Sequence, residues 1–183
     1  PDGNLAGKRV GIMGTGALGT AVARRAVPFG VQLRGFNTRG KAPLPFHECY
    51  RTEDRLGFAA GLDFVIALMP DTPATSALID EGFLRALPQG AVLINAGRAN
   101  AIDHAALRGT LTDGHLRAAV LDVLPREPLP AEDPLWHTQG VYITSHTAAP
   151  TEATAIAPLF LDNLGRYLAG RDLRYEIDFR RGY

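Results

Sequence analysis

The sequence has little of several features that would place it in a specialised class. Its 183 residues include a single cysteine, Cys49, so no disulfide can form within the chain. One unpaired cysteine fits a reducing compartment and favours a cytoplasmic location. No apolar run approaches the roughly 18 residues that a membrane-spanning helix needs, so we expect no membrane partner.

The sequence also has no excess of charge of either sign. The 19 basic residues balance the 19 acidic ones, and only Lys8 and Lys41 are lysine. This balance argues against binding to nucleic acid, which selects a basic surface. At 46% hydrophobic and 21% charged residues the composition is that of an ordinary globular protein. The length corresponds to about one domain.

Short β-rich runs alternate with helical stretches, which is typical of a parallel sheet with helices on both faces. Most runs are continuous Val, Ile and Leu, as expected where both faces of a sheet are buried. We therefore predict an α/β fold, a Rossmann-type doubly wound parallel sheet in three αβα layers. The predicted strands are Arg9–Met13, Val31–Phe36, Phe64–Leu68, Ala91–Asn95, Arg117–Asp122 and Val141–Thr144. The predicted helices are Leu18–Ala26, Asp54–Ala60, Thr75–Ala86 in one or two pieces, Asp103–Thr112 and about Thr151–Leu168.

Four details complete this outline. The helix near the C-terminus is expected to close the fold, with a kink or break at Pro158. Residues 40–53 are predicted to be a connecting loop. Residues 125–134, with four prolines, are predicted to be a rigid loop after a strand. The polar tail 171–183 is expected to dock on another part of the protein or to fray.

A glycine-rich turn, Gly14-Thr15-Gly16-Ala17-Leu18-Gly19, joins the first predicted strand to the first helix. In this G-x-G-x-x-G pattern Gly14 permits the tight turn, and Gly16 lets a pyrophosphate approach the backbone. Gly19 lets the helix pack on the strand. The helix N-terminus offers free N–H groups to phosphate. The turn, including Ala17 and Leu18, predicts a dinucleotide site; a glycine-rich turn that binds nothing is the alternative.

The end of the second predicted strand bears on which dinucleotide binds. A carboxylate there binds the ribose 2′-hydroxyl of NAD, whereas arginine accommodates the 2′-phosphate of NADP. The sequence has Asn37, Thr38 and Arg39, with Lys41 nearby and no carboxylate. We therefore favour NADP(H), with NAD(H) as the alternative. Arg39 as a solvated surface charge is the competing interpretation.

Three polar residues follow late predicted strands, where ligands of open α/β sheets bind. Arg98 offers a planar fork that matches a carboxylate, so it is a candidate for holding an anionic substrate. His146 is a candidate general acid, because an adjacent carboxylate such as Glu127 would favour its charged form. Each residue has a structural alternative, as a loop cap, a surface charge or a structural histidine.

The remaining histidines carry no predicted chemistry. His47 and Cys49 form only an H-x-C pair, and a zinc site needs two further ligands, so no metal is expected. His104 and His115, on or beside the helix 103–112, are expected to face solvent.

Further motifs lie around these residues. They are Ala-Leu-Met-Pro-Asp-Thr-Pro-Ala-Thr at 67–75, Leu-Asp-Val-Leu-Pro-Arg-Glu-Pro-Leu-Pro at 121–130, Pro-Leu-Trp at 134–136, Ile-Thr-Ser-His-Thr-Ala-Ala at 143–149 and Asp-Phe-Arg-Arg-Gly-Tyr at 178–183. With these motifs the chain resembles the D-isomer-specific 2-hydroxyacid dehydrogenases from about Leu5 to Tyr183. It is most similar to their glyoxylate/hydroxypyruvate reductase A branch.

The resemblance implies NADPH-dependent reduction of a small 2-ketoacid to the 2-hydroxyacid. Arg98, Glu127 and His146 match the family's catalytic residues. The residues that match its nicotinamide side are Met69, Pro70, Ala96, Asp122, His146 and Ala148. Two alternatives remain: an NAD-linked phosphoglycerate or D-lactate dehydrogenase, and a dinucleotide-binding regulatory protein like the family's corepressor relatives.

The chain departs from the family pattern at two positions, with Ala99 in place of the usual glycine and Ser145 in place of the usual proline. The resemblance also implies a homodimer and an N-terminal substrate-binding domain of roughly 100 residues. We expect this domain to be absent from the chain, which begins without Met. Residues 1–170 would then form the dinucleotide-binding domain, and residues 171–183 a tail that returns toward the absent domain. Such a chain alone is expected to be inactive.

Overall fold

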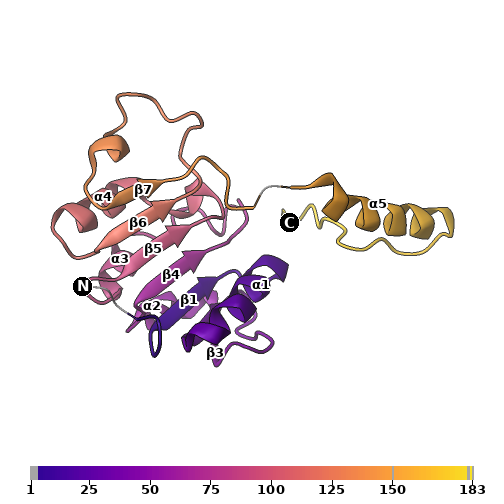
Figure 1. Ribbon diagram of the computed structural model, residues 1–183, viewed down its shortest axis with the longest axis horizontal. Coiled ribbons are helices and arrows are strands. Elements are labelled where there is room, and N and C mark those ends of the chain that lie inside the picture. The colour runs from indigo at the N-terminus through magenta and orange to yellow at the C-terminus, as the bar shows by residue number, and fades with distance from the viewer. Residues whose placement is uncertain (1–3, 150, 181, 183) are drawn as a thin grey trace.

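The computed structural model describes residues 4–149, 151–180 and 182 of the chain. Within these residues, seven parallel strands form one sheet in the order β3-β2-β1-β4-β5-β6-β7 (Figure 1). The strands are β1 (Arg9–Met13), β2 (Gln32–Phe36), β3 (Glu48–Tyr50), β4 (Phe64–Ala67), β5 (Val92–Asn95), β6 (Ala118–Leu121) and β7 (Val141–Ile143). The helices are α1 (Ala17–Ala26), α2 (Arg55–Ala59), α3 (Glu81–Ala86), α4 (His104–Thr112) and α5 (Ala153–Leu168).

The strand order reverses between β1 and β4, which are neighbours in the sheet but not in the chain. This reversal confirms the predicted doubly wound α/β fold. At such a point the loops after the strands diverge and leave a crevice in which ligands bind. The predicted strands are all present, with ends that agree to within a residue.

One strand was not predicted. β3 lies within residues 40–53, which we expected to be a connecting loop, and it pairs with β2 at the edge of the sheet. Three residues with mixed polarity give no strand pattern. Contacts with Arg34 of β2 hold the segment: its Nε lies 2.9 Å from Glu48 Oε2, and its guanidinium lies 5.5 Å from the Tyr50 ring centre.

One helix is shorter than predicted. Residues 75–86 were expected to be helical, but α3 begins only at Glu81. Before it, Thr75 Oγ1 closes a turn by donating to the Pro70 carbonyl at 2.7 Å. Asp80 then caps α3 by accepting from the Phe83 N–H at 2.8 Å, while Arg55 holds the Asp80 carboxylate with two hydrogen bonds. The other helix ends agree to within two residues.

The main core lies between one face of the sheet and helices α2, α3 and α4. Its centre is Phe58, which is fully buried. The Phe58 ring lies 5.0 Å from that of Phe36, 6.0 Å from Tyr50 and 6.3 Å from Phe83, measured between ring centres. These contacts join strands β2 and β3 to the helices that cover them.

The opposite face of the sheet is covered unevenly. Ile12 of β1 is fully buried in a second core cluster that includes Ala23 of α1. Along the same cross-strand row, Ile66, Ile94 and Val120 are only partly buried, and Tyr142 of β7 is 63% exposed. Apolar cover on this face therefore decreases from β1 toward β7.

Helix α5 does not close the fold as the sequence suggested. It extends away from the sheet (Figure 1), and none of its residues is buried. Of the predicted kink or break at Pro158, the break does not occur, because the helix continues through that residue. No helix in the described part of the chain combines the length and apolarity needed to cross a bilayer.

The aromatic cluster gives a stability prediction. Phe58→Ala should lower the free energy of unfolding by about 3–5 kcal/mol, because it leaves a cavity at the centre of the core. Phe29→Ala is the matched control: this ring, in the connection between α1 and β2, is 58% exposed, so its loss should change stability by no more than about 0.5 kcal/mol. Urea denaturation of both variants tests this, and equal losses would contradict the assigned core.

Candidate functional site

The glycine-rich turn has the geometry that its sequence predicts. Gly14 has a φ of +97°, and a side chain there would meet the Leu68 carbonyl oxygen at 2.8 Å. A side chain on Gly19 would overlap the Gly14 carbonyl oxygen, whereas one on Gly16 would meet nothing. The turn is therefore closely packed on the protein side and open at Gly16, where a bound group can approach the backbone.

The first turn of α1 is free to receive an anion. Gly16 is its N-cap and supplies no side-chain hydrogen bond, and the first turn holds no acidic residue. Ala17 is exposed and Leu18 is 47% exposed. Uncapped N–H groups and the partial positive charge of a helix N-terminus favour a phosphate at this position.

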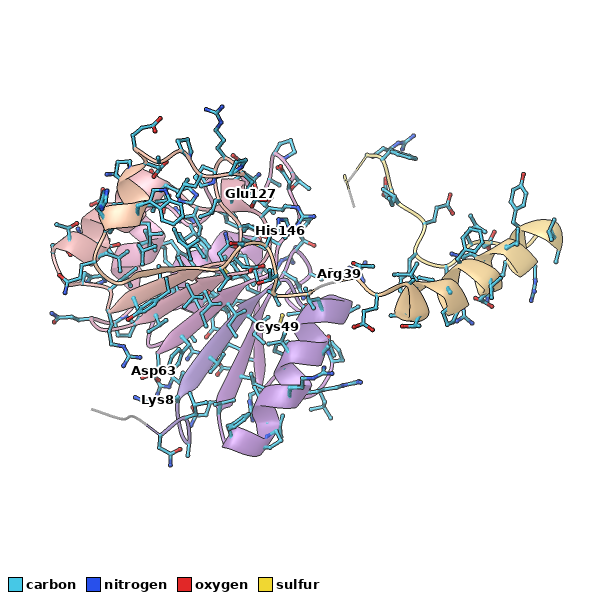
Figure 2. The ribbon with its side chains drawn as sticks, turned by 45° about the horizontal axis from the view of Figure 1, so that its top comes forward. Lys8, Arg39, Cys49, Asp63, Glu127 and His146 are labelled. Carbon is cyan, nitrogen blue, oxygen red and sulfur yellow. The ribbon has the colours of Figure 1, made fainter. Side chains whose placement is uncertain are left out.

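Asn37 organises the loop after β2 beside this turn. Its Nδ2 donates to Thr15 Oγ1 and to the Lys41 carbonyl, and its Oδ1 accepts from the N–H groups of Arg39 and Gly40 at 2.8 Å each. The polar atoms of the Asn37 side chain thus hold the loop in its conformation. Thr38 and Arg39 are exposed, and Arg39 forms no ion pair with any described residue. Figure 2 shows Arg39 at the same end of the sheet as Glu127 and His146.

The structure brings the three candidate catalytic residues together. Arg98, Glu127 and His146 line one cavity of about 390 Å³ at the carboxyl ends of the strands. Asp71, Asn100 and His104 line the same cavity, although none of them was predicted to be a site residue. Figure 2 shows Glu127 and His146 at this end of the sheet, and Lys8 and Asp63 at the opposite end.

Glu127 and His146 form a direct pair. Nδ1 of His146 lies 2.9 Å from Glu127 Oε2, and the other carboxylate oxygen accepts from the Leu124 N–H at 3.0 Å. The hydrogen bond from His146, followed by that from Leu124, lowers the pKa of Glu127 below its usual value. The carboxylate therefore stays charged and fixes the imidazole ring. Within the described residues, Nε2 of His146 has no hydrogen-bond partner and is available to a ligand.

Asp122 fixes the loop that carries His146. Its side chain is buried and accepts from the Thr144 hydroxyl, from the Thr147 N–H at 2.9 Å and from the Ala148 N–H at 3.0 Å. Its carbonyl accepts from the His146 N–H at 2.9 Å. Burial alone would raise the pKa of Asp122, but these side-chain hydrogen bonds outweigh it and the pKa is lowered. The charge holds His146 at its left-handed φ of 55°.

Asn95 does the same for the loop that carries Arg98. This fully buried side chain accepts from the Gly97 N–H at 3.1 Å and donates to the Arg98 carbonyl at 3.0 Å. Arg98 Nη1 donates to the Gly97 carbonyl at 2.8 Å. A side chain on Gly97 would lie 2.7 Å from the Met69 nitrogen, so the loops after β4 and β5 are closely packed. Two other residues predicted to contact the cofactor, Pro70 and Ala96, lie in these same loops.

His104 does not face solvent as we expected. It is half-buried in the cavity wall, with Nε2 3.2 Å from the Ala99 carbonyl and Nδ1 buried without a partner. Burial lowers the pKa of His104, so the ring is held neutral. His115 is also partly buried, with Nε2 3.0 Å from the Leu84 carbonyl. A single histidine at the start of a helix, or just after its end, gave no signal for either contact.

Comparison with known proteins places this site in a family. The model of the D-isomer specific 2-hydroxyacid dehydrogenase NAD-binding domain matches residues 2–148. The chain belongs to this family. Among sequence relatives, glyoxylate/hydroxypyruvate reductase A of Klebsiella pneumoniae is 34% identical over 95% of this chain and 56% of its own length. The corresponding protein of Escherichia fergusonii is 35% identical with the same coverage.

Solved structures of D-isomer specific 2-hydroxyacid dehydrogenases agree. The enzyme of Xanthobacter autotrophicus in complex with NADPH and MES has a TM-score of 0.90 and 36% identity, over 98% of this chain and 57% of its own. The NADPH-dependent glyoxylate/hydroxypyruvate reductase of Sinorhizobium meliloti, in complex with NADP and sulfate, has a TM-score of 0.92 and 30% identity, over 100% and 59%. The chain thus spans a little over half the length of these relatives.

The Asp122 anchor gives a prediction about pH. Asp122→Asn should lower the free energy of unfolding by about 1–3 kcal/mol at pH 7, because an amide cannot accept from all the donors of the loop. The pKa of Asp122 is lowered on folding, so its contribution is complete above the unfolded value of about 3.9 and is lost as pH falls through the folded value.

The difference between wild type and Asp122→Asn should therefore shrink below about pH 4. Asp172→Asn, at an exposed position of the tail, is the control and should have little effect at any pH. Denaturant titrations from pH 3 to pH 7 measure this difference. A destabilisation that is independent of pH would contradict the charged anchor.

Proposed function

We propose that this chain is the cofactor-binding part of an NADPH-dependent reductase that converts a small 2-ketoacid, such as glyoxylate or hydroxypyruvate, to the 2-hydroxyacid. The observation that carries the proposal is the cavity shared by Arg98, Glu127 and His146 at the sheet edge that also holds the glycine-rich turn. The reductases named among the relatives support the same reaction.

The residues at the turn fit a dinucleotide. The open space over Gly16 and the uncapped start of α1 suit a pyrophosphate, and the close packing at Gly14 and Gly19 brings the backbone within its reach. When bound, NADPH supplies the hydride. Met69, Pro70, Ala96 and Ala148 follow the strand ends between the turn and the cavity, where they would line the nicotinamide side.

The chain's own residues would hold the substrate and supply the proton. The Arg98 fork matches a carboxylate, and its positive charge would also polarise the neighbouring carbonyl. Nε2 of His146 has no hydrogen-bond partner among the residues that the structure describes, so it is placed to protonate the developing alkoxide. Glu127 holds the ring in place through its contact with Nδ1, so that Nε2 stays available for this step.

Arg39 is the residue that we propose to select NADPH. It is exposed beside the glycine-rich turn, and the loop that carries it is shaped by Asn37. No carboxylate occupies the end of β2, where one would favour NAD. The relatives whose structures hold NADPH or NADP support this choice.

Two exposed apolar surfaces support the proposal that this chain is part of a larger protein. The unburied side of α5 and the row Ile66, Ile94, Val120 and Tyr142 both offer apolar area to further chain. We propose that residues 1–170 form the dinucleotide-binding domain and that the tail 171–183 returns toward a substrate-binding domain. A homodimer and a cytoplasmic location complete the proposal; the first follows from the resemblance, and the second from the single cysteine.

The proton donor can be tested in the intact enzyme. His146→Ala should lower kcat by about 10²–10⁴-fold, because the alkoxide loses its general acid, while the Kd of NADPH stays close to that of wild type. His137→Ala, at an exposed position outside the cavity, should leave both values unchanged. NADPH oxidation with a panel of 2-ketoacids measures turnover. Unchanged turnover in His146→Ala would remove the assignment, and wild type that binds NADPH without turnover would favour a regulatory protein.

Cofactor choice can be tested by binding. Arg39→Ala should raise the Kd of NADPH about ten-fold through loss of one charge-assisted hydrogen bond to the 2′-phosphate, and it should leave the Kd of NADH unchanged. Arg24→Ala, at an exposed position of α1, is the control. Fluorescence titration with both cofactors gives the four constants. Tighter binding of NADH than of NADPH by wild type would refute the preference.

A further inference from the structure

The cavity contains two opposite charges that do not pair. Arg98 and Asp71 both line it, yet Arg98 forms no ion pair with any described residue, and its guanidinium donates only to the Gly97 carbonyl. The Asp71 carboxylate instead accepts a short hydrogen bond from Nδ2 of Asn100. Both Asp71 and Arg98 are exposed, so burial does not keep them apart.

Asn100 is well placed to hold Asp71. Its carbonyl accepts from the Ala77 N–H at 2.8 Å, and the next carbonyl, that of Ala101, accepts from the Ile79 N–H at 2.9 Å. These bonds fix the turn that follows Arg98 to the segment that follows Asp71. Oδ1 of Asn100 is buried without a partner, so the hydrogen bond to Asp71 is the polar contact that orients the amide.

We propose that Asn100 is a positioning residue that holds the Asp71 carboxylate away from Arg98 and so keeps Arg98 free for the carboxylate of a 2-ketoacid. The inference rests on the proposed function, in which Arg98 binds the substrate. A planar guanidinium pairs preferentially with a carboxylate. A carboxylate in the same cavity competes with the substrate at the high effective concentration of an intramolecular group.

This arrangement has a signature that a purely structural role lacks. If Asn100 only braced the turn, removal of either partner would damage substrate binding, and the two losses would not cancel. If Asn100 restrains a competitor, removal of Asn100 alone weakens binding, whereas removal of both partners restores it.

The test is a double-mutant cycle in the intact enzyme. Asn100→Ala should raise the KM for the 2-ketoacid about five-fold, the effect expected of one exposed ion pair, with kcat and the Kd of NADPH nearly unchanged. Asp71→Ala should not raise KM. The double variant Asn100→Ala/Asp71→Ala should return KM to the wild-type value. Asn100→Ser, whose hydroxyl is too short to hold Asp71, serves in place of Asn100→Ala if that variant does not fold.

A second measurement does not depend on turnover. Titration calorimetry with oxalate, in the presence of NADP, reports carboxylate binding directly, and its Kd should follow the pattern of KM. A raised KM that persists in the double variant, a raised KM in Asp71→Ala, or a normal KM in Asn100→Ala would each overturn the proposal. Failure of the proposed function is detected separately, because the wild type would then show no turnover. In that case the oxalate titrations decide the role of Asn100. If oxalate does not bind to the wild type, the proposed role of Asn100 is also overturned.

Discussion

The buried carboxylate of Asp122 is the interaction on which the site depends most. The segment after β7 has no helix or strand of its own, and His146 within it adopts a left-handed backbone conformation that a non-glycine residue rarely takes. Hydrogen bonds to Asp122 from Thr144, Thr147 and Ala148 offset the cost of that conformation. The position of the imidazole, and with it the pairing with Glu127, follows from one charge at the end of β6.

Buried polar side chains recur at this edge of the sheet. Of the four in the described part of the chain, Thr72, Asn95 and Asp122 follow or end β4, β5 and β6. Each side chain bonds the backbone or a hydroxyl of the loop that carries Asp71, Arg98 or His146. Burying polar groups is costly unless they are fully bonded. For these three side chains the cost falls at one edge of the sheet, where each group fixes a loop.

The sequence predicted the parts that depend on local pattern. The continuous apolar runs located the long strands, the glycine spacing located the turn at residues 14–19, and strand ends located Arg98, Glu127 and His146 at one edge. Strand β3 was missed because a three-residue edge strand is held by Arg34 of its neighbour rather than by its own composition.

The parts that were missed depend on contacts between distant segments. Thr75 and Asp80 delay the start of α3 through hydrogen bonds that no periodicity records. The Asp71–Asn100 bond joins residues 29 positions apart, and His104 is half-buried in a cavity wall that residues far apart in the chain build together. The position of helix α5 likewise depends on the surface against which it packs. The amphipathic pattern of the helix does not reveal which surface that is.

The reversal of strand order between β1 and β4 has a further consequence, for how such a protein can diverge. The residues that we propose to face the phosphates and the ribose come from the β1 and β2 side, whereas Arg98, Glu127 and His146 come from the β5, β6 and β7 side. Because effects at separate sites that share no partners are nearly additive, substitutions that change the nucleotide accepted need not disturb the acid–base groups. Proteins with this topology can therefore change the nucleotide cofactor that they bind and keep the same acid–base groups. They can also keep the cofactor and acquire new substrates.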